Sequence, residues 1–200
     1  MEWSTKAFEA INGMAGKFIV LDALGIIFTQ WLIIGLGCVW FGLVIHRLFQ
    51  RKFFEGVSCL GIGLVAILVS WFLLGPQLKE EFAVPRPAAI YMLADPEESF
   101  SFPSTTALLA FAGSTVTLFF HRKIGIALFG FSLLVGAALV FVGSHYPWDV
   151  IGGGLIGIGL GSVLWLIWKA GPWLVASIIW LAALIIIQIT FQDLKPFRSQ

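Results

Sequence analysis

Long apolar runs separated by short polar connections make up most of the chain. A helix needs about 20 apolar residues to cross the hydrocarbon core of a bilayer, and six runs approach or exceed that length. They cover residues 20–45, 55–75, 104–120, 124–143, 150–168 and 172–191. Residues 2–16 mix Trp3 and Phe8 with Glu2 and Lys6, which predicts an amphipathic helix at the membrane interface. We therefore expect one all-α integral membrane domain over 1–200, with six transmembrane helices and an N-terminal interfacial helix.

Composition supports a membrane location. Hydrophobic residues make up 59% of the chain and charged residues 12%, about half of the roughly 25% charge of an average soluble domain. This excludes an ordinary soluble domain, a disordered chain and a protein that binds nucleic acid through a basic face. Cys38 and Cys59 lack the spacing of a disulfide framework or a zinc site. We expect membrane lipids as partners, with no nucleic acid, no cofactor and no metal, and the pattern leaves the oligomeric state open.

The charged residues divide between the two ends of the predicted spans. Connections 46–55 and 121–123 together with Lys169 hold six Lys and Arg against one acid, whereas the other connections and the termini hold six against ten. Short basic loops mark the cytoplasmic side of a membrane. We therefore expect both termini and the 76–103 loop to face the periplasm or the exterior of a bacterial-type inner or plasma membrane.

The loop 76–103 carries two cations and leads into the next helix. Lys79 and Arg86 lie seven residues apart, and prolines stiffen the segment between them and the helix. Ser104 or Thr105 is expected to cap that helix, whose first N–H groups then face an anion. An Arg fork and a Lys point charge are typical phosphate ligands. The alternative is that both cations are interfacial residues that extend their charged ends to water.

The turn 143–149 carries the second candidate group. His145 precedes Asp149 by four residues, so the imidazole is a candidate nucleophile or base whose tautomer the carboxylate holds. The alternative is a structural pair within the turn. The helix that follows has small residues at every fourth position, at Gly153, Gly157 and Gly161. That spacing predicts a face for close helix packing.

Three segments resemble the signature motifs of the type 2 phosphatidic acid phosphatase (PAP2) family of membrane lipid phosphatases. They are K-x6-R-P at Lys79–Pro87, P-S-G-H at Pro103–Thr106 and S-R-x5-H-x3-D at Ala138–Asp149. The Gly-Ser-His-Tyr-Pro-Trp-Asp turn and the six-span layout are similar to the small bacterial undecaprenyl-diphosphatase-like members. The resemblance covers nearly the whole chain and implies a membrane phosphatase without a metal.

The resemblance also implies a role for each matching residue. In the family, the histidine of the third motif attacks phosphorus and forms a phospho-histidine, and an aspartate raises its basicity. Carried over by position, His145 is the nucleophile and Asp149 orients it. The implied phosphate-binding residues are Lys79, Arg86, Ser104 and Thr105.

The second and third motifs depart from the family pattern. Thr106 stands where the family has the histidine that protonates the leaving group, Leu139 stands where it has a second phosphate-binding arginine, and Ala138 replaces the motif serine. The other histidines, His46 and His121, are expected at the opposite membrane face, about 30 Å away. A missing general acid costs typically 10²–10⁴-fold in rate.

Two functions follow from this combination. In the first, the chain hydrolyses a lipid phosphate or diphosphate, and a diphosphate is favoured because its leaving group is already stable as an anion. Asp95, Glu97 or Glu98 is then a candidate proton source, although such an acidic run is usually a solvated loop. In the second, a degenerate family member binds or transports lipid phosphates without hydrolysis. A purely structural membrane protein is the third and least favoured reading.

Overall fold

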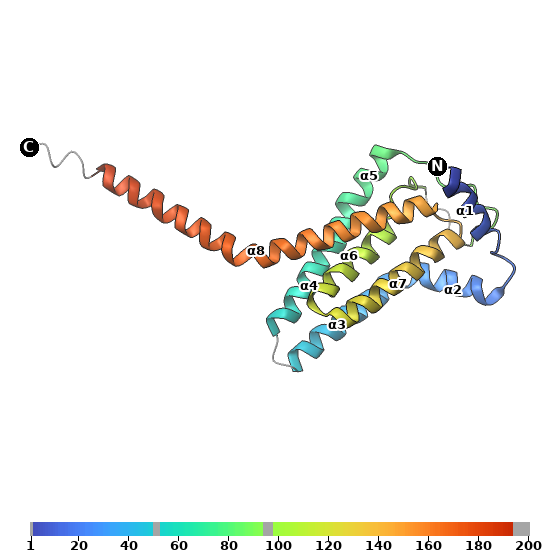
Figure 1. Ribbon diagram of the computed structural model, residues 1–200, viewed down its shortest axis with the longest axis horizontal. Helices are drawn as coiled ribbons and strands as arrows, with labels where there is room; N and C mark the ends of the chain where they lie inside the picture. Colours follow the sequence, from blue (N-terminus) through green and yellow to red (C-terminus); the bar gives the residue numbers. More distant parts are fainter. Residues whose placement is uncertain (1, 50–52, 94–97, 194–200) are drawn as a thin grey trace, which may run out of the picture. The chain divides into compact units, whose positions relative to one another are not determined.

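The computed structural model describes residues 2–49, 53–93 and 98–193, and every regular element in this part of the chain is helical. The elements are α1 Glu2–Asn12, α2 Ile19–Gln30, α3 Leu32–Phe49, α4 Phe53–Leu68, the π-helix η1 Val69–Leu74, α5 Gly75–Phe82, α6 Thr105–Phe120, α7 Arg122–Phe141 and α8 Pro147–Asp193 (Figure 1). The prediction of an all-α fold is confirmed. The chain divides into two compact units, Met1–Trp165 and Leu166–Gln200, and the prediction of one domain over 1–200 stays a prediction.

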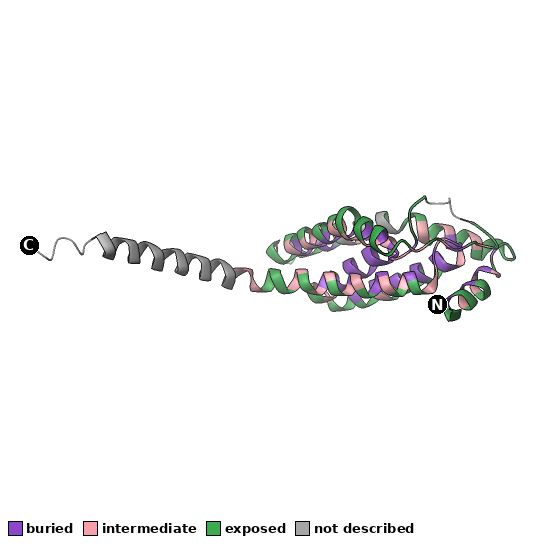
Figure 2. Cartoon of the chain, turned by 90° about the horizontal axis from the view of Figure 1, so that it is seen from above, coloured by how far each residue is buried: buried purple, intermediate pink, exposed green. Residues whose placement is uncertain are grey.

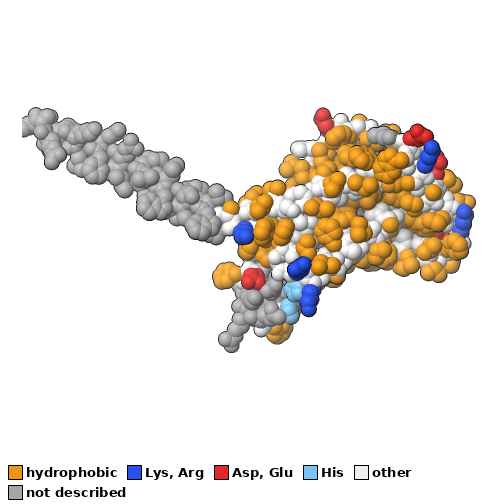
Figure 3. All heavy atoms as spheres, viewed as in Figure 1, with side chains coloured by type: hydrophobic (Ala, Val, Ile, Leu, Met, Phe, Trp, Pro, Cys, Tyr) orange, Lys and Arg blue, Asp and Glu red, His pale blue; other side chains and the backbone are white. Residues whose placement is uncertain are grey.

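Three of the described helical segments are long and apolar enough to cross a membrane. They are Phe54–Phe82, Arg122–Phe141 and Pro147–Gly171, while Ile19–Gln30 and Thr105–Phe120 are shorter apolar helices. Large apolar side chains such as Leu133, Leu155 and Ile126 are more than half exposed, and Figure 3 shows hydrophobic atoms over much of the compact unit's surface. Such a surface suits contact with lipid. The count of six spans stays a prediction.

Two predicted boundaries are wrong. The predicted span 20–45 is interrupted at Trp31, where α2 ends and α3 begins. The hydroxyl of Thr29 donates to the carbonyl oxygens of Gly25 and Ile26 at 3.0 and 3.1 Å, and such back-bonding bends helices. The second boundary is the start of the 76–103 loop, because helix α5 continues to Phe82. Its polar residues are good helix formers, so the helix extends beyond its apolar part.

The break predicted between the spans 150–168 and 172–191 is also absent. Helix α8 is continuous from Pro147 to Asp193, so the predicted spans 150–168 and 172–191 belong to one helix. A proline within a helix removes one backbone hydrogen bond, and membrane helices tolerate that loss. By contrast, the predicted tight connection at 121–123 is confirmed, since His121 alone separates α6 from α7.

Helix α6 is the central element of the first unit. Every residue from Ala107 to Thr117 is buried, and Figure 2 shows buried residues concentrated on the inward sides of the helices. Helix α8 packs closely on α6 because the predicted face of small residues on α8 lies against α6. A Cβ added at Gly157 would lie 2.3 Å from the carbonyl oxygen of Leu108, so only glycine permits this approach. The prediction of a packing face is thus confirmed.

Helix α1 packs against protein as well as presenting an exposed face. Its buried residues Ser4, Phe8 and Asn12 recur at every fourth position. The Ser4 hydroxyl accepts a hydrogen bond from the Trp148 backbone N–H at 3.1 Å, and the Phe8 and Tyr146 rings meet edge to face at 5.3 Å. The buried residues Ser4 and Phe8 of the predicted interfacial helix therefore lie against the 143–149 turn.

Candidate active site

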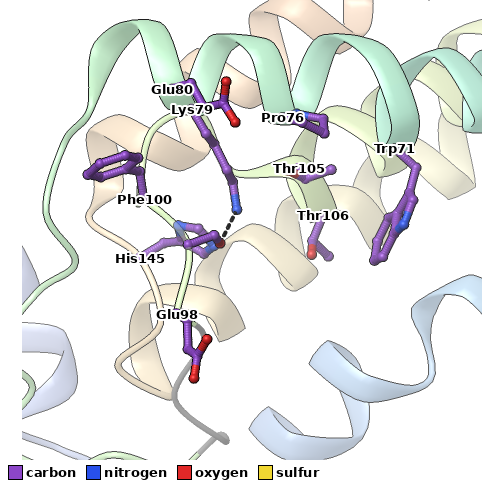
Figure 4. Close-up of a pocket in the computed structure, with 10 residues that line it drawn as sticks. Trp71, Pro76, Lys79, Glu80, Glu98, Phe100, Thr105, Thr106 and His145 are labelled. Carbon is purple, nitrogen blue, oxygen red and sulfur yellow. Dashed lines mark hydrogen bonds between the residues drawn. The ribbon is translucent and has the colours of Figure 1, made fainter.

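A pocket of about 530 Å³ lies where α5, the 98–100 segment, the start of α6 and the 143–149 turn meet. Its lining residues are Trp71, Pro76, Lys79, Glu80, Glu98, Ser99, Phe100, Thr105, Thr106 and His145. Figure 4 shows the Lys79 and His145 side chains at one end, with Trp71 beside Thr106 at the other. The pocket therefore has a polar end, with the carboxylates Glu80 and Glu98 lining it as well as Lys79 and His145, and an end lined by an aromatic ring and a small side chain.

Two cations are held at the polar end by the same serine. The Lys79 ammonium donates to the Ser99 hydroxyl oxygen at 2.9 Å, and Arg86 Nη2 donates to that oxygen at 3.2 Å. Arg86 Nε also donates to the Ser99 carbonyl at 2.8 Å. One oxygen thus lies within hydrogen-bond distance of both cations, which is the position that a phosphate oxygen needs if both cations are to bind it.

The histidine lies next to the guanidinium. His145 Nε2 is 3.5 Å from Arg86 Nη1, and that nitrogen also donates to the Ser144 carbonyl at 2.8 Å. Since a guanidinium can only donate, it favours the tautomer in which Nε2 carries a lone pair and Nδ1 carries the proton. A neutral imidazole of this tautomer presents Nε2 as its nucleophilic atom.

A serine connects His145 to Asp149. His145 Nδ1 is 3.8 Å from Asp149 Oδ2, which exceeds hydrogen-bond length. The Ser101 hydroxyl lies 3.5 Å from His145 Nδ1 and donates a short hydrogen bond to Asp149 Oδ2. The three side chains are buried, with Ser101 fully so. The expected orientation of the imidazole by the carboxylate therefore runs through a hydroxyl.

The local fold fixes this arrangement with backbone contacts. The chain leaves α7 through Gly143, whose φ of 91° is costly for other residues. The His145 N–H then donates to the Leu139 carbonyl at 3.3 Å. Asp149 Oδ2 accepts from the Tyr146 N–H at 2.8 Å. A short polar turn at the start of α8 thereby brings the imidazole to the pocket.

The predicted phosphate-binding residues occupy different positions. Lys79 and Thr105 line the pocket, and Arg86 contacts His145. Ser104 is fully buried, and its hydroxyl accepts from the Ala107 N–H at 3.3 Å as the N-cap of α6. The predicted cap is therefore confirmed for Ser104, while the roles of all four residues toward phosphate stay predictions.

The three positions that depart from the family motifs lie in different surroundings. Thr106 lines the pocket, whereas the Leu139 side chain belongs to the apolar cluster between α6 and α7 that includes Leu109 and Val135. Ala138 is buried at the end of α7. Position 139 therefore contributes its backbone carbonyl to the turn and its side chain to the core, so it presents no cation to the pocket.

Of the three acids considered as proton sources, only Glu98 is within the described residues, and it lines the pocket together with Glu80. Asp95 and Glu97 lie outside them. Sequence reasoning missed Ser99, Ser101 and Trp71. Ser99 and Ser101 belong to no motif that predicts a functional role, because serines are common in the loop before a helix. Trp71 could not be distinguished from the other apolar residues of a predicted membrane span.

Comparison with known proteins shows the family of this chain. Residues 54–173 match the PAP2 superfamily. The chain is 32% identical over 157 residues to undecaprenyl-diphosphatase BcrC of Bacillus subtilis strain 168, covering 77% of this chain and 78% of that protein. It is 25% identical over 173 residues to the bacitracin transport permease protein BcrC of Bacillus licheniformis, with 84% and 81% covered.

Two solved structures share the fold. The Aquifex aeolicus LpxE structure matches with a TM-score of 0.59 and 31% identity, covering 80% of this chain and 92% of that one. The first transmembrane PAP2-type phosphatidylglycerolphosphate phosphatase from Bacillus subtilis matches with a TM-score of 0.55 and 24% identity, covering 82% and 85%. These relatives and the apolar helices identify an integral membrane protein, and the chain belongs to the PAP2 superfamily of membrane phosphatases.

Proposed function

We propose that this chain hydrolyses a polyprenyl diphosphate by way of a phospho-histidine on His145. The observation that carries the proposal is the 3.5 Å distance between His145 Nε2 and Arg86 Nη1, in a pocket that Lys79 also lines. A nucleophilic nitrogen beside two cations suits attack on an anionic phosphorus centre. The name of the Bacillus subtilis relative, an undecaprenyl-diphosphatase, supports the same substrate class.

The proposed reaction has two steps. In the first, the Nε2 lone pair of His145 forms a bond to the terminal phosphorus, and the bond from that phosphorus to the bridging oxygen breaks. The electron pair of that bond leaves on the lipid monophosphate, and the Nδ1 proton stays directed at Ser101. In the second, a water oxygen forms a bond to phosphorus, the bond from phosphorus to Nε2 breaks and its electron pair returns to Nε2. The protons of that water leave with the inorganic phosphate or pass to solvent, which restores the imidazole. Each turnover consumes one diphosphate and one water.

The leaving-group side of the pocket supports a diphosphate. Thr106 lines the pocket at the position where the family places its acid, and a threonine hydroxyl is too weakly acidic to protonate an alkoxide at neutral pH. A phosphate leaving group needs no such proton, whereas the alkoxide from a phosphate monoester does. We therefore infer that diphosphates react much faster than phosphatidic acid.

We also propose that the site faces the exterior. Arg122 and Lys123 are exposed at the start of α7, close to the His46 and His121 rings, whose centroids are 6.2 Å apart. Figure 3 shows the blue and pale-blue side chains of this basic cluster gathered at one end of the compact unit. The pocket lies beyond the opposite end of α7, and basic ends are normally cytoplasmic.

Phosphate release from polyprenyl diphosphate by the purified protein in detergent tests the proposal. His145→Ala should abolish release, while His121→Ala, a histidine substitution at the other end of α7, should leave it unchanged. Acid-labile ³²P on the wild-type protein, absent from His145→Ala, should identify the phospho-histidine. Release that persists in His145→Ala would overturn the mechanism.

A second candidate function is binding or transport of lipid phosphates without hydrolysis. Thr106 in the pocket and the core position of Leu139 favour it, because together they remove an acid and a cation from the family pattern. If wild-type protein releases no phosphate from any lipid, yet binds a lipid diphosphate and loses that binding in Arg86→Ala, this function replaces the first.

A further inference from the structure

The helix that carries Lys79 contains an extra residue in one turn, and that residue changes which side chain reaches the pocket. Between α4 and α5, the six residues Val69–Leu74 form the π-helix η1. In a regular α-helix, the position seven residues before Lys79 shares its face, and that position is Phe72. A π-turn adds one residue, so the shared face moves to Trp71, eight residues before Lys79.

The side chains follow this shifted register. Trp71 lines the pocket together with Pro76 and Lys79, five and eight residues later. Phe72 is not among the lining residues, and it is 72% exposed against 47% for Trp71. Because π-turns are uncommon and recur at functional sites, the placement of an indole in the pocket is the feature that this turn provides.

The indole lies at the apolar end of the pocket. Eight residues of helix correspond to about 12 Å along the axis, and they lead from Lys79 back into the apolar helical segment Phe54–Phe82. Thr106, which Figure 4 shows beside Trp71, has a small side chain. A diphosphate held by Lys79 and Arg86 would thus direct the first carbon atoms of its lipid toward the indole.

We propose that Trp71 is a specificity-determining residue that stacks on the first isoprene unit of a prenyl diphosphate. The inference rests on the proposed function and extends it to the lipid chain. An isoprene unit is flat at its methyl-substituted double bond, so it offers an indole face broad dispersion contact, whereas a saturated chain offers a narrow edge. A diacylglycerol phosphate brings two chains and two ester groups to the same position, which one ring beside a threonine does not match.

Binding of three non-hydrolysable probes tests this inference. The probes are a farnesyl methylenediphosphonate, its saturated dodecyl counterpart and methylenediphosphonate alone. For wild-type protein, the farnesyl probe should bind more tightly than the dodecyl probe. Trp71→Ala should weaken the farnesyl probe about tenfold, remove the preference over dodecyl and leave methylenediphosphonate within about twofold. Trp71→Phe, which keeps an aromatic ring, should retain most of the preference.

Phe72→Ala is the matched control, because it removes the neighbouring aromatic side chain from the same π-helix and should leave all three affinities unchanged. The inference is overturned if Phe72→Ala and Trp71→Ala have equal effects, if Trp71→Ala weakens methylenediphosphonate as much as the farnesyl probe, or if the preference for farnesyl survives Trp71→Ala. The probes cannot be hydrolysed, so these results stand even if the wild-type protein releases no phosphate, which is the separate failure of the proposed function.

Discussion

The two sides of the pocket differ in how they are built. On the nucleophile side, Arg86 contacts Ser99, Ser144 and His145 through polar atoms, and Ser101 joins His145 to Asp149. On the leaving-group side, Thr106 and Trp71 line the pocket with one small hydroxyl and one aromatic ring. In the proposed reaction, charge and orientation thus support bond formation to phosphorus, while bond cleavage is left largely to the chemistry of the substrate.

This difference between the two sides indicates which leaving group a substrate of the proposed site needs. Charge-assisted contacts on the attacking side act on the phosphoryl group that all lipid phosphates share. The other side contacts only what is attached to that group. A substrate whose leaving group departs as a stable anion needs nothing more from the protein, so the contrast between the two sides predicts selectivity for diphosphates.

Among variants that keep His145, the largest effect is expected from Arg86→Ala. This substitution removes the guanidinium that faces His145 Nε2. The substrate phosphate then loses a positively charged ligand, and the imidazole loses a neighbouring hydrogen-bond donor. We expect kcat/KM for polyprenyl diphosphate to fall about 10²–10³-fold, as for other lost donors to a developing charge. Phosphate-release kinetics measure it. Arg122→Ala, which removes an exposed cation at the opposite end of α7, should change kcat/KM less than twofold, and an equal loss in both variants would contradict the assignment.

The second prediction restores an acid to the leaving-group side. Thr106→His places an imidazole in the pocket, and general acid catalysis contributes typically 10²–10⁴-fold when it is well positioned. Without the rest of the family motif, we expect about a 10- to 100-fold gain with phosphatidic acid and less than about threefold with polyprenyl diphosphate.

Thr106→Asn is the control for this gain, because its amide is polar but cannot donate a proton to an alkoxide. Kinetics on both substrates for both variants measure the contrast between a leaving group that needs a proton and one that does not. An equal gain on the two substrates, or a gain in Thr106→Asn, would show that the new polar side chain acts through substrate binding rather than through proton supply.

The sequence predicted four residues of the candidate site but not the contacts between them. Lys79, Arg86, His145 and Asp149 carry charge or a titratable ring in an apolar chain, so their positions stand out against the background. Ser99 and Ser101 do not, because a serine in a polar loop is ordinary. Only the fold shows that one lies between two cations and that the other lies between the imidazole and the carboxylate.

The same limit applies to the helices. Apolar runs predicted α6 and α7 within about two residues, because hydropathy changes sharply at their ends. The interruption at Trp31 and the π-turn at Val69–Leu74 escaped prediction, since the few polar residues there, Thr29, Gln30 and Ser70, are too short a break to end an apolar run. The placement of Trp71 in the pocket therefore had no sequence signal.

The third prediction concerns the link between His145 and Asp149. Ser101→Ala leaves both residues in place but removes the hydroxyl between them, so we expect kcat to fall about tenfold with little change in KM. If the serine acts through Asp149, then Ser101→Ala combined with Asp149→Asn should lose much less than the product of the two single losses. Ser114→Ala, a buried serine of α6 that bonds to Ser132, should not alter kcat. Additive losses in the double variant would show that the serine acts independently.

The smallest effect on turnover is expected from Asn12, because it supports the nucleophile side without touching the pocket. Its amide nitrogen donates to the carbonyls of Tyr91 and Phe141 at 2.8 and 2.9 Å, and its oxygen accepts from the Ile90 and Tyr91 N–H groups at 2.9 and 3.1 Å. Asn12 is fully buried, so Asn12→Ala leaves backbone groups without partners at a cost of about 1–3 kcal/mol.

The expected outcome for Asn12→Ala is a lower unfolding temperature in detergent, with kcat of the folded fraction reduced less than about threefold. The reason is that the four bonds tie α1 to the loop and to the end of α7, while Arg86 and Ser101 hold the imidazole directly. Lys6→Ala serves as the control, since it removes only an exposed ion pair with Glu2 on the same helix, worth about 0.2–0.5 kcal/mol. A loss of turnover in Asn12→Ala as large as that of Ser101→Ala, at unchanged stability, would mean that α1 belongs to the nucleophile side itself.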